Sequence, residues 1–116
     1  VGEDIVLKSK GDQFFSYTYI ADAVAAMVHV LINGEVGVPY NISNEKCDMH
    51  LKDFAESCAK TAGKKVVFEL PSEAEQKGFS IATQAILSNA RLVACGFVPQ
   101  YSFEDSIRRT IEILRV

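Results

Sequence analysis

The sequence predicts a small α/β domain, an α+β-like lobe in which short strands alternate with three to four helices. Its 116 residues match the size of one ordinary domain, and 48% of them are hydrophobic while 23% are charged. Short runs of β-branched and aromatic residues alternate with segments whose apolar residues recur at helical spacing. No repeat, low-complexity run or linker interrupts the chain, so residues 1–116 are expected to form a single domain.

Charge and composition exclude several function classes. The net charge is −3 and the 12 basic residues are scattered apart from two adjacent pairs, so we expect no nucleic-acid partner. The longest apolar-rich stretch, residues 24–32, is too short to span a bilayer, so we expect no membrane partner. Three cysteines without a Cys-x-x-Cys pair, and no secretory signal, predict a cytoplasmic location. The first residue is Val1, which suggests a piece of something longer or a processed protein.

The N-terminal quarter predicts two strands. Residues 5–7 are a short apolar run, and Gly11-Asp12 is a turn signal. Residues 13–20 are rich in aromatic and β-branched side chains, which favours a second and longer strand.

The first helix is predicted to follow directly. Asp22 can cap it, and its apolar positions are Val24, Met27, Val28 and Leu31. We expect Asn33-Gly34 to end it, because glycine adopts the left-handed conformation at no steric cost.

The middle of the chain predicts a strand, a helix and a strand. Residues 38–42 form the first of these strands. The helix follows, with apolar residues at helical spacing at Leu51, Phe54, Ala55, Cys58 and Ala62, and Gly63 ends it. Residues 65–70 form the next strand.

The C-terminal part is less regular at first. Residues 72–87 are ambiguous, with a polar first half that is looped or forms one short helical turn. A short helix is expected from residue 88 or 89 to Gly96. Ser102 begins the last helix, with Asp105 in the position that a capping-box Glu usually takes, and its buried stripe comprises Ile107, Ile111 and Leu114.

Several catalytic signatures are absent from the sequence. The seven glycines include no Gly-x-Gly-x-x-Gly turn, and no tyrosine is followed four residues later by lysine. His29 and His50 lie far apart without neighbouring ligand patterns, so a metal site is not expected, and a capping role for His50 outweighs a catalytic one. The chain alone is therefore expected to hold no cofactor and to catalyse no reaction.

Five segments, in order, resemble the extended short-chain dehydrogenase/reductase family, the NAD-dependent nucleotide-sugar epimerases and dehydratases. They are Gln13 to Ala23 with its aspartate at a strand–helix junction, Gly37 to Ile42 ending in Tyr-Asn, Leu51 to Ala55, Gly96-Phe97-Val98-Pro99, and Ser102 to Asp105. Each segment alone is a weak signal, but together they cover nearly the whole chain.

The resemblance implies a place within a longer protein. These segments are similar to the family's C-terminal lobe, which holds a nucleoside diphosphate sugar. The family's N-terminal Rossmann domain, with its NAD site and catalytic Tyr-x-x-x-Lys, is absent from this chain. The parent would be an isomerase, lyase or oxidoreductase of carbohydrate metabolism that uses NAD, with a homodimer as a further expectation.

The resemblance also suggests substrate-binding residues, with no catalytic residue among them: Phe15, Tyr17, Tyr40, Asn41 and Lys77. The family commonly has arginine where this chain has Phe15, and again near Lys77, so an aromatic ring and a single ammonium replace two guanidinium groups. Phe15 can stack on a base or pack in the core. Phe15, Tyr17 and Tyr19 are alternate residues, so on one strand their side chains would share a face.

Plainer interpretations remain open for these residues. The aromatic strand can simply pack on a helix, Asn41 can satisfy local backbone groups, and Lys77 can be a solvated loop residue. A second hypothesis is a free-standing, non-catalytic binding or interaction module of the same architecture. Under the first hypothesis the fragment alone would show no turnover and would expose an apolar face where the missing lobe packs.

Overall fold

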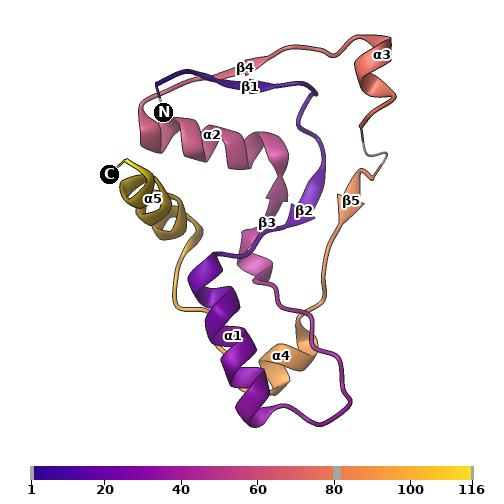
Figure 1. The fold of residues 1–116 in the computed structure, drawn as a ribbon, viewed down its shortest axis with the longest axis vertical. Coiled ribbons are helices and arrows are strands. Elements are labelled where there is room, and N and C mark those ends of the chain that lie inside the picture. Colours follow the sequence, from indigo (N-terminus) through magenta and orange to yellow (C-terminus); the bar gives the residue numbers. More distant parts are fainter. Residues whose placement is uncertain (1, 80–81, 116) are drawn as a thin grey trace.

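The short apolar runs form two small sheets (Figure 1) in the computed structural model, which describes residues 2–79 and 82–115. Strand β1 (Ile5–Leu7) pairs in parallel with β4 (Val66–Phe68). Strand β2 (Phe14–Ser16) lies between β3 (Asp48–His50), to which it is antiparallel, and β5 (Gln84–Ala85), to which it is parallel. The predicted mixed α/β class with short strands is confirmed.

The expected strand over residues 13–20 is wrong beyond Ser16. Its register with β3 ends at the Ser16–Asp48 pair, and β5 accompanies only Phe14 and Phe15. No described strand lies beside residues 17–20, and without such a neighbour their aromatic and β-branched composition cannot sustain a ladder.

The described residues contain five helices. They are α1 (Ile20–Asn33), α2 (Leu51–Ala62), α3 (Glu73–Gln76), α4 (Ala90–Ala94) and α5 (Phe103–Leu114), with a 3-10 turn at Glu45–Cys47. The four helices that the sequence predicts, α1, α2, α4 and α5, are confirmed. The short α3 is the helical turn anticipated in the ambiguous region. None of these helices has the length and apolar character that crossing a bilayer requires.

Both ends of α1 differ from expectation. Asp22 lies inside the helix and does not cap it, and the residue before the helix, Tyr19, makes no side-chain cap. Gly34 has a φ of −74°, so left-handed geometry does not explain the stop. A Cβ on Gly34 would lie 2.5 Å from the carbonyl oxygen of Val30 and 3.3 Å from the ring of Tyr40. The lack of space for a side chain therefore explains why glycine occupies this position.

The other helix boundaries follow the sequence more closely. Gly63, at φ +69°, ends α2 in the left-handed conformation. His50 precedes α2, but its imidazole Nδ1 donates to the carbonyl of Asp12 instead of capping, so the capping expectation is wrong. The hydroxyl of Ser102 accepts from the backbone N–H of Asp105 at 3.1 Å and caps α5.

Residues 38–42 are not a strand, which corrects the expectation. They run through an irregular connection between α1 and the Glu45–Cys47 turn, and no described segment pairs with them. Strand β3, which the sequence did not suggest, forms instead because Asp48–His50 lies directly opposite β2.

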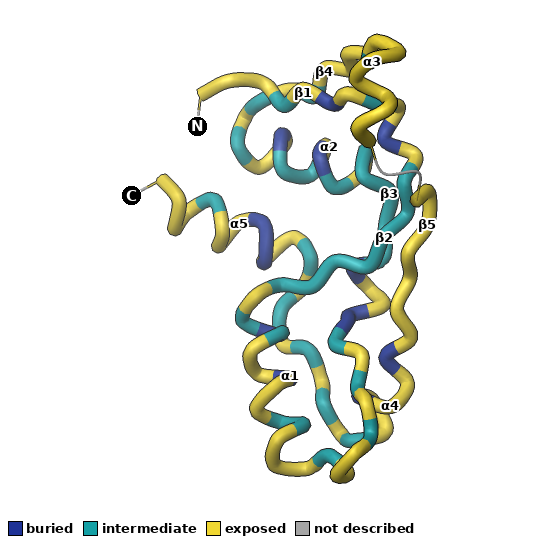
Figure 2. Tube along the Cα trace, turned by 45° about the vertical axis from the view of Figure 1, so that its right-hand side comes forward, coloured by how far each residue is buried: buried dark blue, intermediate teal, exposed yellow. Residues whose placement is uncertain are grey.

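The core of the chain is small (Figure 2). The buried apolar residues of the described part are Leu7, Ala26, Cys47, Ala55, Ala59, Leu92 and Ile107. Leu114, expected in the buried stripe of α5, is 67% exposed. The sheets and α2 lie at one end of the molecule and α1 with α4 at the other (Figure 1). The radius of gyration is 16.6 Å, whereas a compact chain of this length has about 13 Å.

Candidate functional site

The first candidate site is a cavity of about 360 Å³ beside the β1–β2 turn, which we call the Phe15 hollow. Strand β2 alternates its side chains, so the ring of Phe14 packs at a tilt against that of His50, with centroids 4.8 Å apart, while Phe15 lines the hollow. Lining residues come from four separate segments: Leu7, Lys8, Ser9, Gln13, Phe15, Leu51, Gly78, Phe79 and Ala82. A volume of this size suits a small ring or part of a larger ligand.

Polar groups lie at the rim of the Phe15 hollow. The hydroxyl of Ser9 accepts from the backbone N–H of Gly11 at 3.1 Å, while its contacts with the amide of Gln13 are long, at 3.4 Å. The Gln13 amide therefore retains hydrogen-bonding capacity for a ligand. Lys8 pairs with Glu69 at 3.0 Å, and the hydrogen bond with Glu69 raises the pKa of the Lys8 ammonium.

Helix α3 positions the far wall of the hollow. Ser72 and Glu75 form a reciprocal capping box, and the hydrogen bond from the Ser72 backbone lowers the pKa of the Glu75 carboxyl. Lys77 follows α3 as its C-cap residue, and Gly78 and Phe79 come next at the cavity wall. The structure therefore brings the expected residue Phe15 to the segment that contains Lys77. The Lys77 side chain is exposed.

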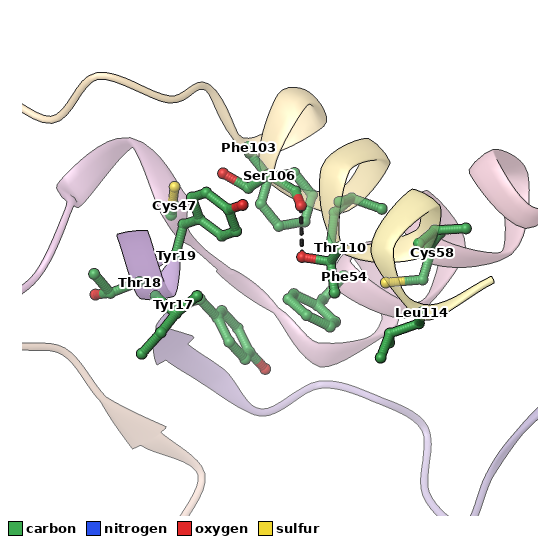
Figure 3. A pocket seen from close by; sticks show the side chains of 13 residues that line it. Tyr17, Thr18, Tyr19, Cys47, Phe54, Cys58, Phe103, Ser106, Thr110 and Leu114 are labelled. Atoms are coloured by element: carbon green, nitrogen blue, oxygen red, sulfur yellow. Dashed lines mark hydrogen bonds between the residues drawn. The ribbon is translucent and has the colours of Figure 1, made fainter. Parts of the chain in front are cut away.

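Tyr17 lies in a different hollow, of about 510 Å³, between α2, α5 and the β2–α1 connection (Figure 3). Its ring stacks on Phe54 with centroids 4.5 Å apart, and Phe54 in turn packs against Phe103. Tyr19 lines the same hollow, so the common face expected for Phe15, Tyr17 and Tyr19 is wrong. The strand that would have imposed it stops at Ser16.

The hollow around Tyr17 has little polar chemistry. The hydroxyl of Thr110 donates to the carbonyl of Ser106 (Figure 3), and the hydroxyl of Ser106 donates to the carbonyl of Ser102, so neither is free to donate to a ligand. Burial raises the pKa of the Tyr17 phenol and that of the Cys58 thiol, which keeps both neutral at ordinary pH. This hollow can therefore receive apolar groups, and it contains no acid or base matched to neutral pH.

Tyr40 and Asn41 lie at the opposite end of the molecule from the Phe15 hollow. The hydroxyl of Tyr40 accepts from the backbone N–H of Glu35 at 3.0 Å, next to the end of α1. The amide of Asn41 donates to the carbonyl of Ser88 at 3.1 Å. Asn41 thus satisfies a backbone group, as the plainer interpretation held, but one that is distant in sequence. Phe15, Tyr17, Tyr40 and Asn41 therefore line four separate hollows, and Lys77 lines none of these four.

The structure adds residues to the site that sequence reasoning missed. Phe79 and Gln13 line the Phe15 hollow, and Leu51 closes it from the start of α2. A signal for Phe79 was present in the sequence, since it follows Lys77-Gly78 directly. No signal pointed to Leu51, because its place in the predicted apolar stripe of α2 assigned it to the core.

Catalytic and cofactor groups do not assemble in the described residues. They contain no cluster of three or more His, Cys, Asp or Glu side chains suited to a metal ion. The glycines at positive φ, such as Gly11, Gly37 and Gly96, occupy separate turns, and only Gly11 approaches another backbone closely. The residues present therefore do not fit the glycine-lined cradle that holds a dinucleotide pyrophosphate.

Comparison with known proteins gives a consistent relationship. No protein-family model matches the chain. It is 28% identical to dTDP-glucose 4,6-dehydratase 1 of Escherichia coli K12, in a match that covers 96% of this chain and 32% of that protein. The chain thus spans about a third of the length of the curated relatives it matches.

Solved structures show the same fold. Bacillus anthracis dTDP-glucose 4,6-dehydratase, in complex with NAD, superposes with a TM-score of 0.79 and 18% identity, over 98% of this chain and 35% of that one. UDP-N-acetylglucosamine 4-epimerase from Bacillus cereus superposes with a TM-score of 0.77 and 18% identity, over 99% of this chain and 39% of that one. The resemblance to extended short-chain dehydrogenase/reductase epimerases and dehydratases, and the fold it implies, are confirmed.

Proposed function

We propose that this chain is the C-terminal, nucleotide-sugar-binding part of an NAD-dependent nucleotide-sugar dehydratase or epimerase. The observation that carries the proposal is the pattern of coverage: 96–99% of this chain aligns with about a third of each relative. The relatives' names state that they act on dTDP-glucose or UDP-N-acetylglucosamine. The proposed substrate class is therefore a nucleoside diphosphate sugar.

The Phe15 hollow is the proposed place for the nucleoside. Phe15 and Phe79 offer aromatic faces on which a base can stack, and the Gln13 amide can hydrogen-bond to a base edge. Lys77, next to Gly78, would contribute one positive charge to the diphosphate. Tyr17, Tyr40 and Asn41 lie outside this hollow, so their proposed substrate contacts require a ligand that extends beyond it.

Nicotinamide chemistry would be supplied by the part of the protein outside this chain. This chain's residues do not fit the dinucleotide, so their proposed work is to bind and to orient. Binding energy from the distant nucleotide would fix the sugar carbon where the reaction occurs, which raises the rate by positioning. Under the same proposal the parent enzyme is cytoplasmic and forms a homodimer. Its reaction is that of a lyase, if it is a dehydratase, or of an isomerase, if it is an epimerase.

The alternative, a free-standing binding module, is favoured only by the aromatic ring at Phe15. The amount of exposed surface opposes it. The chain has 8178 Å² of accessible surface, whereas a compact protein of 12.8 kDa has about 6,300 Å². A module adapted to exist alone would bury more of this surface.

The proposal is tested on the natural full-length protein by titration calorimetry with dTDP-glucose and UDP-N-acetylglucosamine. We expect one of the two sugar nucleotides to bind, and glucose without the nucleotide not to bind. Phe15→Ala should weaken binding about tenfold, since stacking a base on an aromatic side chain contributes ~1–3 kcal/mol.

Phe68→Ala is the matched control, because Phe68 is a half-exposed phenylalanine on β4 that does not line the Phe15 hollow. It should leave the affinity unchanged. An equal loss of affinity in Phe15→Ala and Phe68→Ala would contradict the proposed site. A natural protein that carries no NAD and binds neither sugar nucleotide would contradict the function.

A further inference from the structure

Lys8 is the charged residue in the wall of the Phe15 hollow. Among the described residues that line this cavity, no other side chain carries a formal charge. Lys8 follows directly after β1, whose last residue, Leu7, is buried and lines the same cavity. Lys8 is therefore the residue through which this wall can attract a charged group of a ligand.

The ammonium group of Lys8 lies at the mouth of the hollow. It pairs with the carboxylate of Glu69 at 3.0 Å, and Glu69 is not one of the residues that line the cavity. Glu69 comes just after β4, on the way to α3 (Figure 1), and its backbone N–H donates to the carbonyl of Leu7 at 2.8 Å. The stem of Lys8 thus forms part of the wall, while its charged end meets Glu69 outside it.

The ion pair between Lys8 and Glu69 is easily exchanged. The two side chains are 44% and 60% exposed, and water screens an ion pair that is this accessible, so the pair contributes little free energy. Glu75, the other carboxylate that acts on Lys8, is held in the capping box by the backbone N–H of Ser72 at 2.9 Å. A ligand group with more than one negative charge can therefore displace Glu69 from the ammonium, because the attraction grows with the charge.

A nucleoside diphosphate in the hollow brings such a group to the mouth. A cavity of about 360 Å³ suits a ring or part of a larger ligand, and Phe15 and Phe79 offer faces on which a base can stack. The diphosphate of that ligand then lies outside the cavity, where the ammonium of Lys8 is. Lys77 is less well placed, because its side chain is exposed and does not line the hollow.

We propose that Lys8 exchanges its ion pair with Glu69 for one with the diphosphate of the substrate. Lys8 is then a substrate-binding residue, and Glu69 competes with the ligand for the same ammonium group. The inference rests on the proposed function, since it takes a nucleoside diphosphate sugar as the ligand. It adds a residue to the proposed site, and it requires that loss of a carboxylate outside the cavity improves binding.

Binding of UDP and uridine, and of dTDP and thymidine, to the natural full-length protein tests this exchange, because each pair of ligands differs only by the diphosphate. Calorimetry measures the diphosphates, and NMR titration measures the nucleosides. Lys8→Gln should weaken binding of the accepted diphosphate about tenfold, the loss of one charge-assisted hydrogen bond, and that of its nucleoside less than about twofold. Lys8→Arg should restore the affinity for the diphosphate. Glu69→Gln should strengthen diphosphate binding by about twofold or more.

The matched control is the ion pair between Lys52 and Asp12. Its N–O distance is 3.6 Å, its side chains are 42% and 67% exposed, and neither residue lines the hollow. Lys52→Gln and Asp12→Asn should each change the affinity by less than about twofold.

Three results would overturn the inference and leave the proposed function intact. They are an unchanged affinity in Lys8→Gln, a loss of the same size in Lys52→Gln, and an equal loss for diphosphate and nucleoside. Weaker diphosphate binding in Glu69→Gln would overturn it as well, since a competitor's removal cannot weaken the ligand. A natural protein that binds neither UDP nor dTDP would remove both the inference and the proposed function.

Discussion

The carboxylate of Asp22, in the first turn of α1, accepts a hydrogen bond from the backbone N–H of Gln100 at 2.9 Å. Its second oxygen accepts from the backbone N–H of Tyr101 at 3.3 Å. The side chain is almost completely buried, at 3% exposure. Asp22 therefore joins the start of α1 to the segment before α5, across nearly eighty residues of sequence.

Replacing Asp22 should destabilise the natural protein. Asp22→Ala leaves two backbone N–H groups without their acceptor and is expected to cost about 2–4 kcal/mol of unfolding free energy. Asp22→Asn keeps one oxygen acceptor and should cost less than Asp22→Ala. Urea unfolding of both variants measures the difference, and a loss below 0.5 kcal/mol for Asp22→Ala would show that the two bonds contribute little.

Gly11 should tolerate alanine worse than Gly37 does. Both have positive φ, so each alanine pays about 1–2 kcal/mol for the left-handed backbone. A Cβ at Gly11 would also lie 2.7 Å from Cβ of Lys52, whereas a Cβ at Gly37 meets nothing within 4 Å. The midpoint of thermal unfolding should therefore be higher for Gly37→Ala than for Gly11→Ala. The reverse order would contradict the close approach of Gly11 to Lys52 in α2.

Two cysteines should react slowly with iodoacetamide. Burial raises the pKa of the Cys47 thiol, with Asp22, Asp48 and Glu104 adding to the shift, and burial raises the pKa of the Cys58 thiol as well. A raised thiol pKa means less thiolate at a given pH, so alkylation should begin at higher pH than in urea. Mass spectrometry of labelled peptides between about pH 7 and 10 measures this.

Asp48→Asn provides the control for the thiol prediction. It removes one of the negative charges near Cys47 without affecting Cys58, whose shift comes from burial alone. The labelling profile of Cys47 should move slightly toward neutral pH, and that of Cys58 should stay in place. Movement of both would indicate a general loosening of the fold.

Acid should weaken the start of α5. Hydrogen bonds from Arg108 and from Ser102 lower the pKa of the Asp105 carboxyl. A carboxyl whose pKa is lower in the folded state contributes stability above its unfolded pKa, and that contribution is lost as pH falls through the folded value. Asp105→Asn should therefore reduce the difference in unfolding midpoint between pH 7 and about pH 3, and an unchanged difference would contradict the assignment.

Local signals in the sequence were sufficient to predict the long helices. Helix α2 ends where Gly63 adopts positive φ, and α5 begins where Ser102 caps it, so both were predictable from adjacent residues. The class of fold and the family resemblance followed from such segments taken in order. The proposed site residues do not come together in one place, because Phe15 and the segment after Lys77 line one hollow while Tyr17 lines another.

Pairing between distant segments could not be predicted. Strand β5 has no strand-like composition at Gln84–Ala85 and exists because it lies along Phe14 and Phe15. Conversely, residues 38–42 have strand-like composition, and no strand in the described part of the chain pairs with them. A strand is a property of two segments, so a single segment's composition predicts it only when its partner is known.

The parallel pairing of β1 with β4 also constrains the order in which the molecule forms. Ile5 is opposite Val66, so β1 has no strand partner until β4 has also been synthesised. Closing so long a loop is slow compared with forming α1 or α2 locally. Helices α1 and α2 can therefore form before β1 acquires its neighbour, and we expect the emergence of β4, not that of β1, to set when this end of the molecule resists proteases.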